Sequence, residues 1–450
     1  MYHTLTTWFS ILTLIFMPMA ATAGGLIRDA EIEHTLRAYA NPIFQSAGIP
    51  SEDVRILIVS DPAVNAFVAG GLNIFINTGL IRVTKNPGML IGVIAHETGH
   101  ISGAHLSQLR TKTNRAVLGS AISAVLGAAA IAGGASSVGA GIISSGQNVT
   151  LRSFLTQVRI NEQSADHAAL KFLDDNEISS AGMLEMFETL RRNESGVVNK
   201  RDPYLQTHPL SSTRIATVRN HVKVSDIPKG QTPPHFVHMH ARMVAKLAAF
   251  MEPRDTTYKL YPTSRNDIAA RYARAIADFK ATESEKAITA MRQLVKEKPN
   301  DPFFYDTLGQ ILFETGDLNG ATAAYQRASA LLPDSPLILT DYAKTLIARD
   351  DPALLGRATA LLEHATTLDD GNDFTWRQLA IAYGKRGDLG ASYLALAEES
   401  SLQGDFETVL QHTKRARGHI NNESTIALQI DDLERDAREQ LTQQRKNSLF

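Results

Sequence analysis

Two histidines and a glutamate stand close together in the apolar stretch IGVIAHETGHISGA at residues 91–104. Residues four apart on a helix lie on the same face, so His96 and His100 project their imidazoles toward a common point. Two imidazoles in this arrangement form a chelating pair for zinc. Glu97 cannot share that point, but its carboxylate can reach a water at the metal and act as general base. The spacing therefore predicts zinc-dependent hydrolysis, with one zinc ion per chain.

A third protein ligand is expected on a second helix, which the pattern VRINEQSADHAALKFL predicts at residues 158–173. Glu162 and Asp166 lie one turn apart on one face of this helix. Glu162 is the candidate ligand, and Asp166 would accept a hydrogen bond from one of the histidines and so orient it. A solvated acidic face of a surface helix is the alternative interpretation of the same spacing.

The elements that position these residues are helices and a few short strands. Hydrophobic periodicity predicts an amphipathic helix near residues 28–47, a strand at 54–60, and two short strands around Gly70 and Gly71. Asn86 and the proline after it supply a cap and a first-turn residue for the helix that carries His96. A mixed α+β domain of the zincin type is therefore expected in the first half of the chain.

The composition narrows the class of function. With 450 residues the chain exceeds one ordinary compact domain, and 44% hydrophobic residues suffice for globular packing. Lys+Arg 45 against Asp+Glu 47 leaves a formal charge of −2, which provides no field for a polyanion, so nucleic acid is excluded as a partner. The absence of cysteine excludes both disulfides and a lipid-modified cysteine anchor.

The first 23 residues predict a secretory signal peptide. An apolar run, WFSILTLIFMPMAATA, ends in an A-x-A cleavage pattern at residues 21–23, so cleavage after Ala23 is expected. Export to the periplasm of a bacterium follows from this interpretation. An uncleaved N-terminal anchor is the alternative, although the apolar run is short for a bilayer.

Residues 116–151 contain no charged side chain, with Ala, Gly, Ser, Val and Ile predominating. Small residues recur four apart from Ser120 to Ala132, which permits close helix packing or membrane contact. Because the segment lies in sequence between the two predicted ligand helices, we expect a lid or plug over the active-site cleft. Peripheral membrane contact, or insertion into lipid, is the alternative.

Helical hairpins with a period near 34 residues follow at 263–417, after a connecting linker and helix at 223–262. This is the period of the tetratricopeptide repeat (TPR). The best copy, at residues 302–333, matches the signature at eight positions: Tyr305, Leu308, Gly309, Leu312, Ala321, Tyr325, Ala328 and Pro333. Such repeats stack into an α-solenoid whose concave surface suits peptides or partner proteins. A C-terminal helix is expected at 418–450.

The motifs together resemble a known family. HETGH, followed about sixty residues later by E-x-x-A-D, is similar to the zinc metallopeptidases related to HtpX and the CAAX prenyl proteases. The resemblance implies that Glu162 is the third zinc ligand, although Ser164 stands where that family usually has a second glutamate. HPLSSTR at 208–214 matches the family motif H-P-x-x-x-x-R. His208 would then be a fourth ligand or gate that blocks water, or a group that stabilises the transition state, while a structural turn histidine is the alternative.

The order of signal peptide, peptidase domain at 24–222 and repeats resembles the periplasmic β-barrel assembly-enhancing proteases of Gram-negative bacteria. This resemblance implies degradation of misfolded or stalled outer-membrane proteins, with the repeats binding clients or the β-barrel assembly machinery. We expect substrate to pair by its backbone with the strand Ala66, Phe67, Val68 and Ala69. Two alternatives stay open: a TPR scaffold or chaperone with latent proteolysis, and a membrane-embedded peptidase that spans the bilayer with 116–151.

Overall fold

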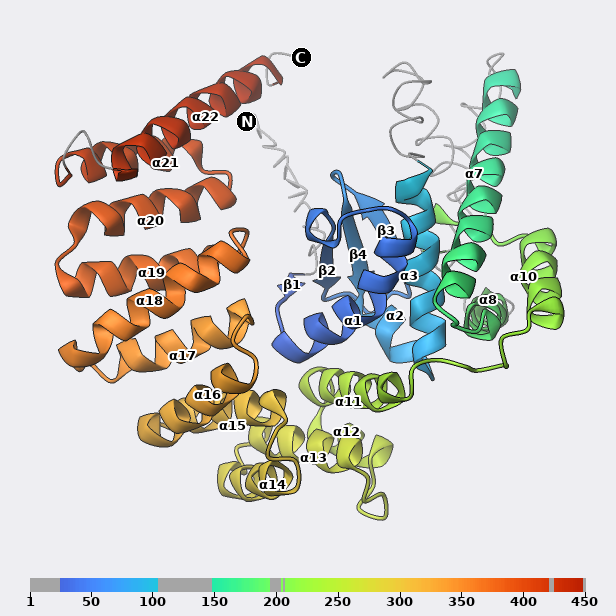
Figure 1. Ribbon diagram of the computed structural model, residues 1–450, viewed down its shortest axis with the longest axis horizontal. Coiled ribbons are helices and arrows are strands. Elements are labelled where there is room, and N and C mark those ends of the chain that lie inside the picture. Colours follow the sequence, from blue (N-terminus) through green and yellow to red (C-terminus); the bar gives the residue numbers. More distant parts are fainter. Residues whose placement is uncertain (1–24, 104–147, 195–203, 205–206, 421–424, 448–450) are drawn as a thin grey trace, which may run out of the picture.

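The computed structural model describes residues 25–103, 148–194, 204, 207–420 and 425–447. The predicted signal peptide lies outside these residues, and so does the uncharged segment up to residue 147. A small sheet with surrounding helices forms the first half, and a curved stack of helical hairpins forms the second (Figure 1). This architecture confirms the predicted fold class. Within the described ranges, no helix has both the length and the apolar character needed to span a bilayer.

The sheet has four strands in the spatial order β1-β2-β4-β3. Their bounds are Leu26–Ile27 for β1, Arg55–Val59 for β2, Ala66–Ala69 for β3 and Asn73–Asn77 for β4. β2 pairs in parallel with β4, whereas β1 and β3 are antiparallel to their neighbours. Gly70 and Gly71 join β3 to β4 at φ values of 62° and 102°, a region that glycine enters without strain. β3 and β4 were predicted, but β1 was not, because two residues show no alternation.

One face of the sheet packs against helices and forms the core of the first half. The helices of this half are α1 (Ala30–Ser46), α2 (Thr78–Val83), α3 (Pro87–Ser102), α7 (Asn148–Asp175), α8 (Ala181–Glu194) and α10 (Ser212–Val224). α3 begins as the sequence predicts, because the Asn86 side chain accepts a hydrogen bond from the backbone N–H of Met89. α3 contacts α1, α7, α8 and β3, so it runs through the centre of this core.

The second half is built from helices that contact mainly their sequence neighbours. These helices are α11 (Pro234–Met251), α12 (Arg254–Leu260), α13 (Ile268–Lys280), α14 (Ser284–Glu297), α15 (Pro302–Glu314), α16 (Leu318–Leu331), α17 (Pro336–Ala348), α18 (Pro352–Leu368), α19 (Asp373–Arg386), α20 (Leu389–Leu402), α21 (Phe406–Arg417) and α22 (Thr425–Asn447). At Gly309 of α15 an added Cβ would lie 2.9 Å from the Tyr325 ring on α16. The small residue of the repeat signature therefore lets the paired helices approach.

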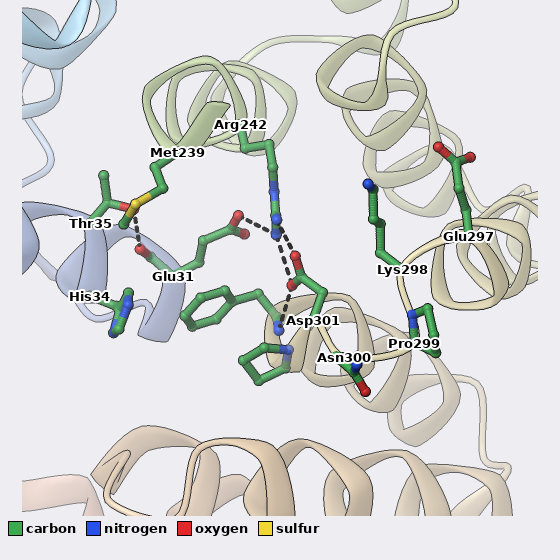
Figure 2. Close-up of a pocket in the computed structure, with 12 residues that line it drawn as sticks. Glu31, His34, Thr35, Met239, Arg242, Glu297, Lys298, Pro299, Asn300 and Asp301 are labelled. Carbon is green, nitrogen blue, oxygen red and sulfur yellow. Dashed lines mark hydrogen bonds and ion pairs between the residues drawn. The ribbon is translucent and has the colours of Figure 1, made fainter. Parts of the chain in front are cut away.

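A buried polar cluster joins the two halves where α1 meets α11 and the first repeats (Figure 2). Glu31 is 3% exposed, and its carboxylate lies 2.6 Å from Nη2 of Arg242. Arg242 also pairs with Asp301, which precedes α15. Tyr272 donates a hydrogen bond of 2.9 Å to Glu31, and Lys246 lies 3.4 Å from the same carboxylate. Each charge of this cluster thus has an opposite partner, as burial requires.

A second contact forms where the array curves back toward the sheet (Figure 1). Arg28, which follows β1, pairs with Asp369 at 2.6 Å, and Arg55 of β2 pairs with Asp370 at 3.0 Å. Both acidic residues belong to the loop between α18 and α19. The Arg55–Asp370 pair is exposed to solvent and contributes little to stability on its own. The Arg28–Asp369 pair is less exposed, and α11 contributes apolar side chains to the cores of both halves, so the halves are joined by apolar packing as well as by charged pairs.

Candidate active site

The helices α3 and α7 approach closely at one point, and this point sets the geometry of the site. An added Cβ at Gly99 would lie 2.7 Å from the carbonyl oxygen of Ala165, so only glycine allows this contact. Gly99 belongs to the HETGH motif, and Ala165 belongs to the E-x-x-A-D motif. The two small residues therefore bring together the helices that carry the polar side chains of both motifs.

Four ligand-type residues converge beside this contact. One ligand atom from each of His96, His100, Glu162 and His208 lies within 4.8 Å of the other three. The Nε2 atoms of His96 and His100 are 3.1 Å apart, and they lie 3.4 Å and 3.3 Å from the two carboxylate oxygens of Glu162. Three imidazoles and one carboxylate are the donors that zinc takes in proteins, so the residues present fit this ion.

Asp166 orients one of the imidazoles. Its Oδ1 lies 2.9 Å from Nδ1 of His96, which leaves Nε2 of the same ring facing the cluster. Burial lowers the pKa of His96, but the carboxylates of Asp166 and Glu162 more than offset this effect and raise the pKa to about 9. Zinc requires the neutral ring, so binding of the ion would displace this proton. The solvated acidic face, which was the alternative for Glu162 and Asp166, does not apply, since both are buried.

Arg214 is a site residue that the sequence interpretation did not assign. Its guanidinium makes two hydrogen bonds to Asp166, at 2.7 and 2.8 Å, and its Nη1 lies 2.7 Å from Oε2 of Glu162. The same Nη1 donates to the backbone carbonyl of Pro209, next to His208. Arg214 is 3% exposed. Burial lowers its pKa, but the carboxylates of Asp166 and Glu162 raise the pKa by more than burial lowers it, so the side chain stays charged. The arginine of the HPLSSTR motif was the available signal.

Glu97 is buried at 1% exposure, and neither of its carboxylate oxygens has a hydrogen-bond partner among the described residues. Its Oε1 lies 3.5 Å from Nε2 of His208. Burial raises the pKa of Glu97, and the electrostatic influence of the neighbouring His208 and His96 side chains only partly counters this effect. A carboxylate with a raised pKa is suited to take up and release a proton near neutral pH.

His208 lies inside the cluster and not in a turn remote from it. Its Nδ1 is 3.3 Å from Nε2 of His96 and 3.2 Å from Oε1 of Glu162. The Tyr204 ring stacks on the imidazole with 4.7 Å between centroids. A purely structural turn residue would not need to direct a ring nitrogen at the other ligand-type atoms, so this placement favours the ligand or gate interpretation.

The strand expected to bind substrate lies at one edge of the sheet, beside α3 (Figure 1). β3 comprises Ala66, Phe67, Val68 and Ala69, and it pairs with β4 on one side only. No other strand of the described residues pairs with its outer side. Ala66 is fully buried, whereas Phe67, Val68 and Ala69 are partly exposed, so an added strand could reach this side only along the second part of β3.

A His-Glu-x-x-His helix that meets a carboxylate from a second helix defines a metallopeptidase-type site. Comparison with known families agrees: residues 27–222 match the profile of Peptidase family M48, and residues 257–398 match that of the Cytochrome c-type biogenesis protein H TPR domain. The chain is therefore a metallopeptidase, in which a region similar to Peptidase family M48 is followed by tetratricopeptide repeats.

Proteins named beta-barrel assembly-enhancing protease are similar to most of the chain. The Beta-barrel assembly-enhancing protease of Yersinia pestis is 25% identical over 84% of this chain and 78% of its own length. A Putative beta-barrel assembly-enhancing protease of Vibrio cholerae is 24% identical over 89% of this chain and 83% of its own. The Escherichia coli K12 protein named Beta-barrel assembly-enhancing protease is 20% identical over 88% and 80%. The predicted resemblance to these proteases is confirmed.

Proposed function

We propose that the chain is a periplasmic zinc metalloendopeptidase that cleaves misfolded or stalled outer-membrane proteins. The observation that supports this proposal best is the convergence of His96, His100 and Glu162, together with the burial of Glu97 on the helix that carries both histidines. The names of the relatives support an outer-membrane client. Export by a signal peptide cleaved after Ala23 belongs to the same proposal, and residues 1–23 lie outside the described part of the chain.

Each residue of the site has a distinct role in the proposed peptide hydrolysis. His96, His100 and Glu162 would hold zinc, which when bound polarises the scissile carbonyl and makes an attacking water more acidic. Glu97 accepts the proton of that water on a carboxylate oxygen and then delivers it to the leaving amine. Asp166 keeps His96 in the tautomer that presents Nε2 to the site. Arg214 holds Asp166, Glu162 and the backbone beside His208 in their relative positions.

We further propose that His208 controls access to the site. Its imidazole lies beside both Glu97 and the three ligand residues, where it would act as a fourth ligand and exclude the attacking water. The chain before it, at 205–206, lies outside the described residues. A latent resting enzyme would follow, and His208→Ala should raise the rate of casein hydrolysis if this proposal holds. A lower rate with zinc retained would instead favour stabilisation of the transition state, and an unchanged rate would favour a structural role.

Clients would bind in two places. An extended segment pairs with the outer edge of β3, since backbone pairing requires little sequence specificity. The repeats would hold unfolded or misfolded clients, or the β-barrel assembly machinery, on their concave side. The segment 116–151 remains a proposed lid or plug, or a site of peripheral membrane contact. Its deletion should speed casein hydrolysis; an unchanged rate with zinc retained would contradict the lid.

The decisive experiment compares the purified chain with its Glu97→Gln variant. Both should contain one zinc per chain, because Glu97 is not a ligand in this proposal. Casein hydrolysis should fall by about 10²- to 10⁴-fold in the variant, the usual contribution of a general base. A zinc-free wild-type chain, or equal hydrolysis by both chains, would refute the peptidase mechanism.

The alternative function, a TPR scaffold or chaperone with latent proteolysis, draws support from the size of the repeat array. It predicts that Glu97→Gln fully restores outer-membrane protein assembly in cells that lack the wild-type chain. Under the peptidase proposal the same variant should fail to remove stalled clients. Zinc content measured on the protein from those cells would show that the comparison concerns catalysis alone.

A further inference from the structure

The face of the sheet that points away from the core carries an apolar row. Leu57 of β2, Phe75 of β4 and Phe67 of β3 are register partners across three adjacent strands. The Phe67 and Phe75 rings stack, with centroids 4.9 Å apart and an interplanar angle of 11°. We call these three residues the outer apolar row.

Core packing does not explain the outer apolar row. The alternate residues of the same strands, such as Ile58, Ile74 and Ile76, are buried in the hydrophobic core on the other face. The three residues of the row are only half-buried, and they do not belong to that core or to the side chains packed against it. Among the described residues, this sheet face therefore carries a partly exposed cross-strand apolar surface that ends at the edge strand β3.

The position of the row at that edge determines what can extend it. A strand added beside β3 would place one side chain opposite Phe67, on the same face as the row. The side chains before and after it would point to the opposite face, where α3 packs. Aromatic and apolar cross-strand neighbours stabilise each other, and polar residues gain little from such a neighbour.

We propose that Phe67, the residue of the outer apolar row on the edge strand, selects client segments that carry an aromatic or aliphatic side chain opposite it. This inference rests on the proposed peptidase function and adds a side-chain preference to the backbone pairing at β3. Only every second client side chain would lie on the same face as the row. The favoured class of client is therefore an extended segment in which apolar and polar residues alternate. Strands of transmembrane β-barrels have this alternation, because one face contacts lipid and the other faces the lumen.

Two quenched fluorescent peptides of equal length test the inference. One alternates Phe with Thr, and the other has Thr at every position, so they differ only in the apolar face. The zinc-loaded wild-type chain should cleave the alternating peptide with the higher kcat/KM. Phe67→Thr should lower that preference by about two- to five-fold, the range expected for one cross-strand pair. Threonine keeps β-propensity, so the strand itself should persist.

Leu57→Thr is the matched control. It removes an apolar residue from the same row, but on β2, two strands away from the edge of β3 and about 10 Å from it. The peptide preference should stay at the wild-type value in this variant. Equal loss in both variants, or retained preference in Phe67→Thr, would overturn the inference. The all-Thr peptide should be cleaved at similar rates by the wild-type and Leu57→Thr chains, which shows that the control substitution causes no general damage.

Binding of the labelled alternating peptide to the Glu97→Gln chain tests the row without cleavage. In that background, Phe67→Thr should raise the Kd measured by fluorescence anisotropy by the same two- to five-fold. Leu57→Thr should leave this Kd unchanged. Failure of cleavage in the wild-type chain alongside intact Phe67-dependent binding would refute the proposed peptidase function and leave the row supported. Cleavage without any Phe67 dependence would refute the row and leave the peptidase function supported.

Discussion

Arg214 offers a sharp test of the active-site geometry, because one guanidinium contacts three parts of the site. It binds Asp166 through two hydrogen bonds, lies 2.7 Å from Glu162, and donates to the carbonyl of Pro209. Arg214→Lys keeps the positive charge but replaces the planar fork with a single ammonium. Lysine cannot bind all of these groups at once, so at least one carboxylate loses its position.

The expected cost follows from the hydrogen bonds that lysine cannot make. Hydrogen bonds to charged groups contribute about 1.5–3 kcal/mol each, so the variant should lose at least this amount of stability. Residues that orient metal ligands typically change metal affinity by about 10- to 100-fold when replaced. Since Asp166 orients His96 and Glu162 is itself a proposed ligand, we expect zinc affinity to fall within this range.

Competition with a zinc-binding chromophore measures the affinity, and thermal unfolding measures the stability. Arg219→Lys is the matched control, because Arg219 lies on the same helix and pairs with Glu188, but its side chain is 40% exposed. The control should change zinc affinity by less than about two-fold. If Arg214→Lys binds zinc as tightly as the control does, Arg214 does not position the ligands, and the proposed geometry of the zinc-loaded site is wrong.

Three other groups of residues give further predictions. Gly99→Ala should lower the zinc content and reduce the free energy of unfolding by about 1–3 kcal/mol, because the added Cβ would meet the α7 backbone. The control is Gly356→Ala, which has open space around it and should not destabilise the chain in thermal unfolding. Arg242→Ala should remove one charged partner of the buried Glu31, which keeps Lys246 and Tyr272, and so cost about 1.5–3 kcal/mol. Urea unfolding measures this cost, and limited proteolysis between the halves checks the domain contact. Burial raises the pKa of Asp278, but hydrogen bonds from a guanidinium, a phenol and an ammonium lower it below the usual value. This stabilisation is present above pH about 4 and lost as the pH falls through the folded-state pKa, so the urea midpoint of Asp278→Asn should approach that of the wild type at acidic pH.

The parts of the site that depend on local periodicity could be predicted from the sequence. The spacing of His96 and His100 indicates one helix face, and their Nε2 atoms lie 3.1 Å apart. Spacing alone could not identify Glu162 as a ligand, since an acidic residue on a helix is usually solvated. Arg214 could not be predicted from the residues alone, because it lies 48 positions from Asp166 and nothing local specifies that they meet.

The same distinction applies to the fold. The repeat hairpins follow from a short-range pattern of small and large residues, such as Gly309 against Tyr325. The junction between the halves does not, because Glu31 has the sequence signature of a first-turn surface residue of α1. Its burial depends on Arg242 and Tyr272, which lie more than two hundred positions later. Contacts of this kind are decided by tertiary packing and leave no periodic signal.

The two edge strands of the sheet have different neighbours, and this difference supports the role proposed for β3. An exposed edge strand invites pairing with other chains, and proteins usually protect such edges. Near β1, the loop between α18 and α19 lies against the sheet through Arg28 and Arg55. β3 has no such neighbour among the described residues, although it borders the helix that carries His96 and Glu97. An open edge beside a catalytic helix is a liability unless extended chains bind there, and its length of four residues limits pairing to a short segment of a client.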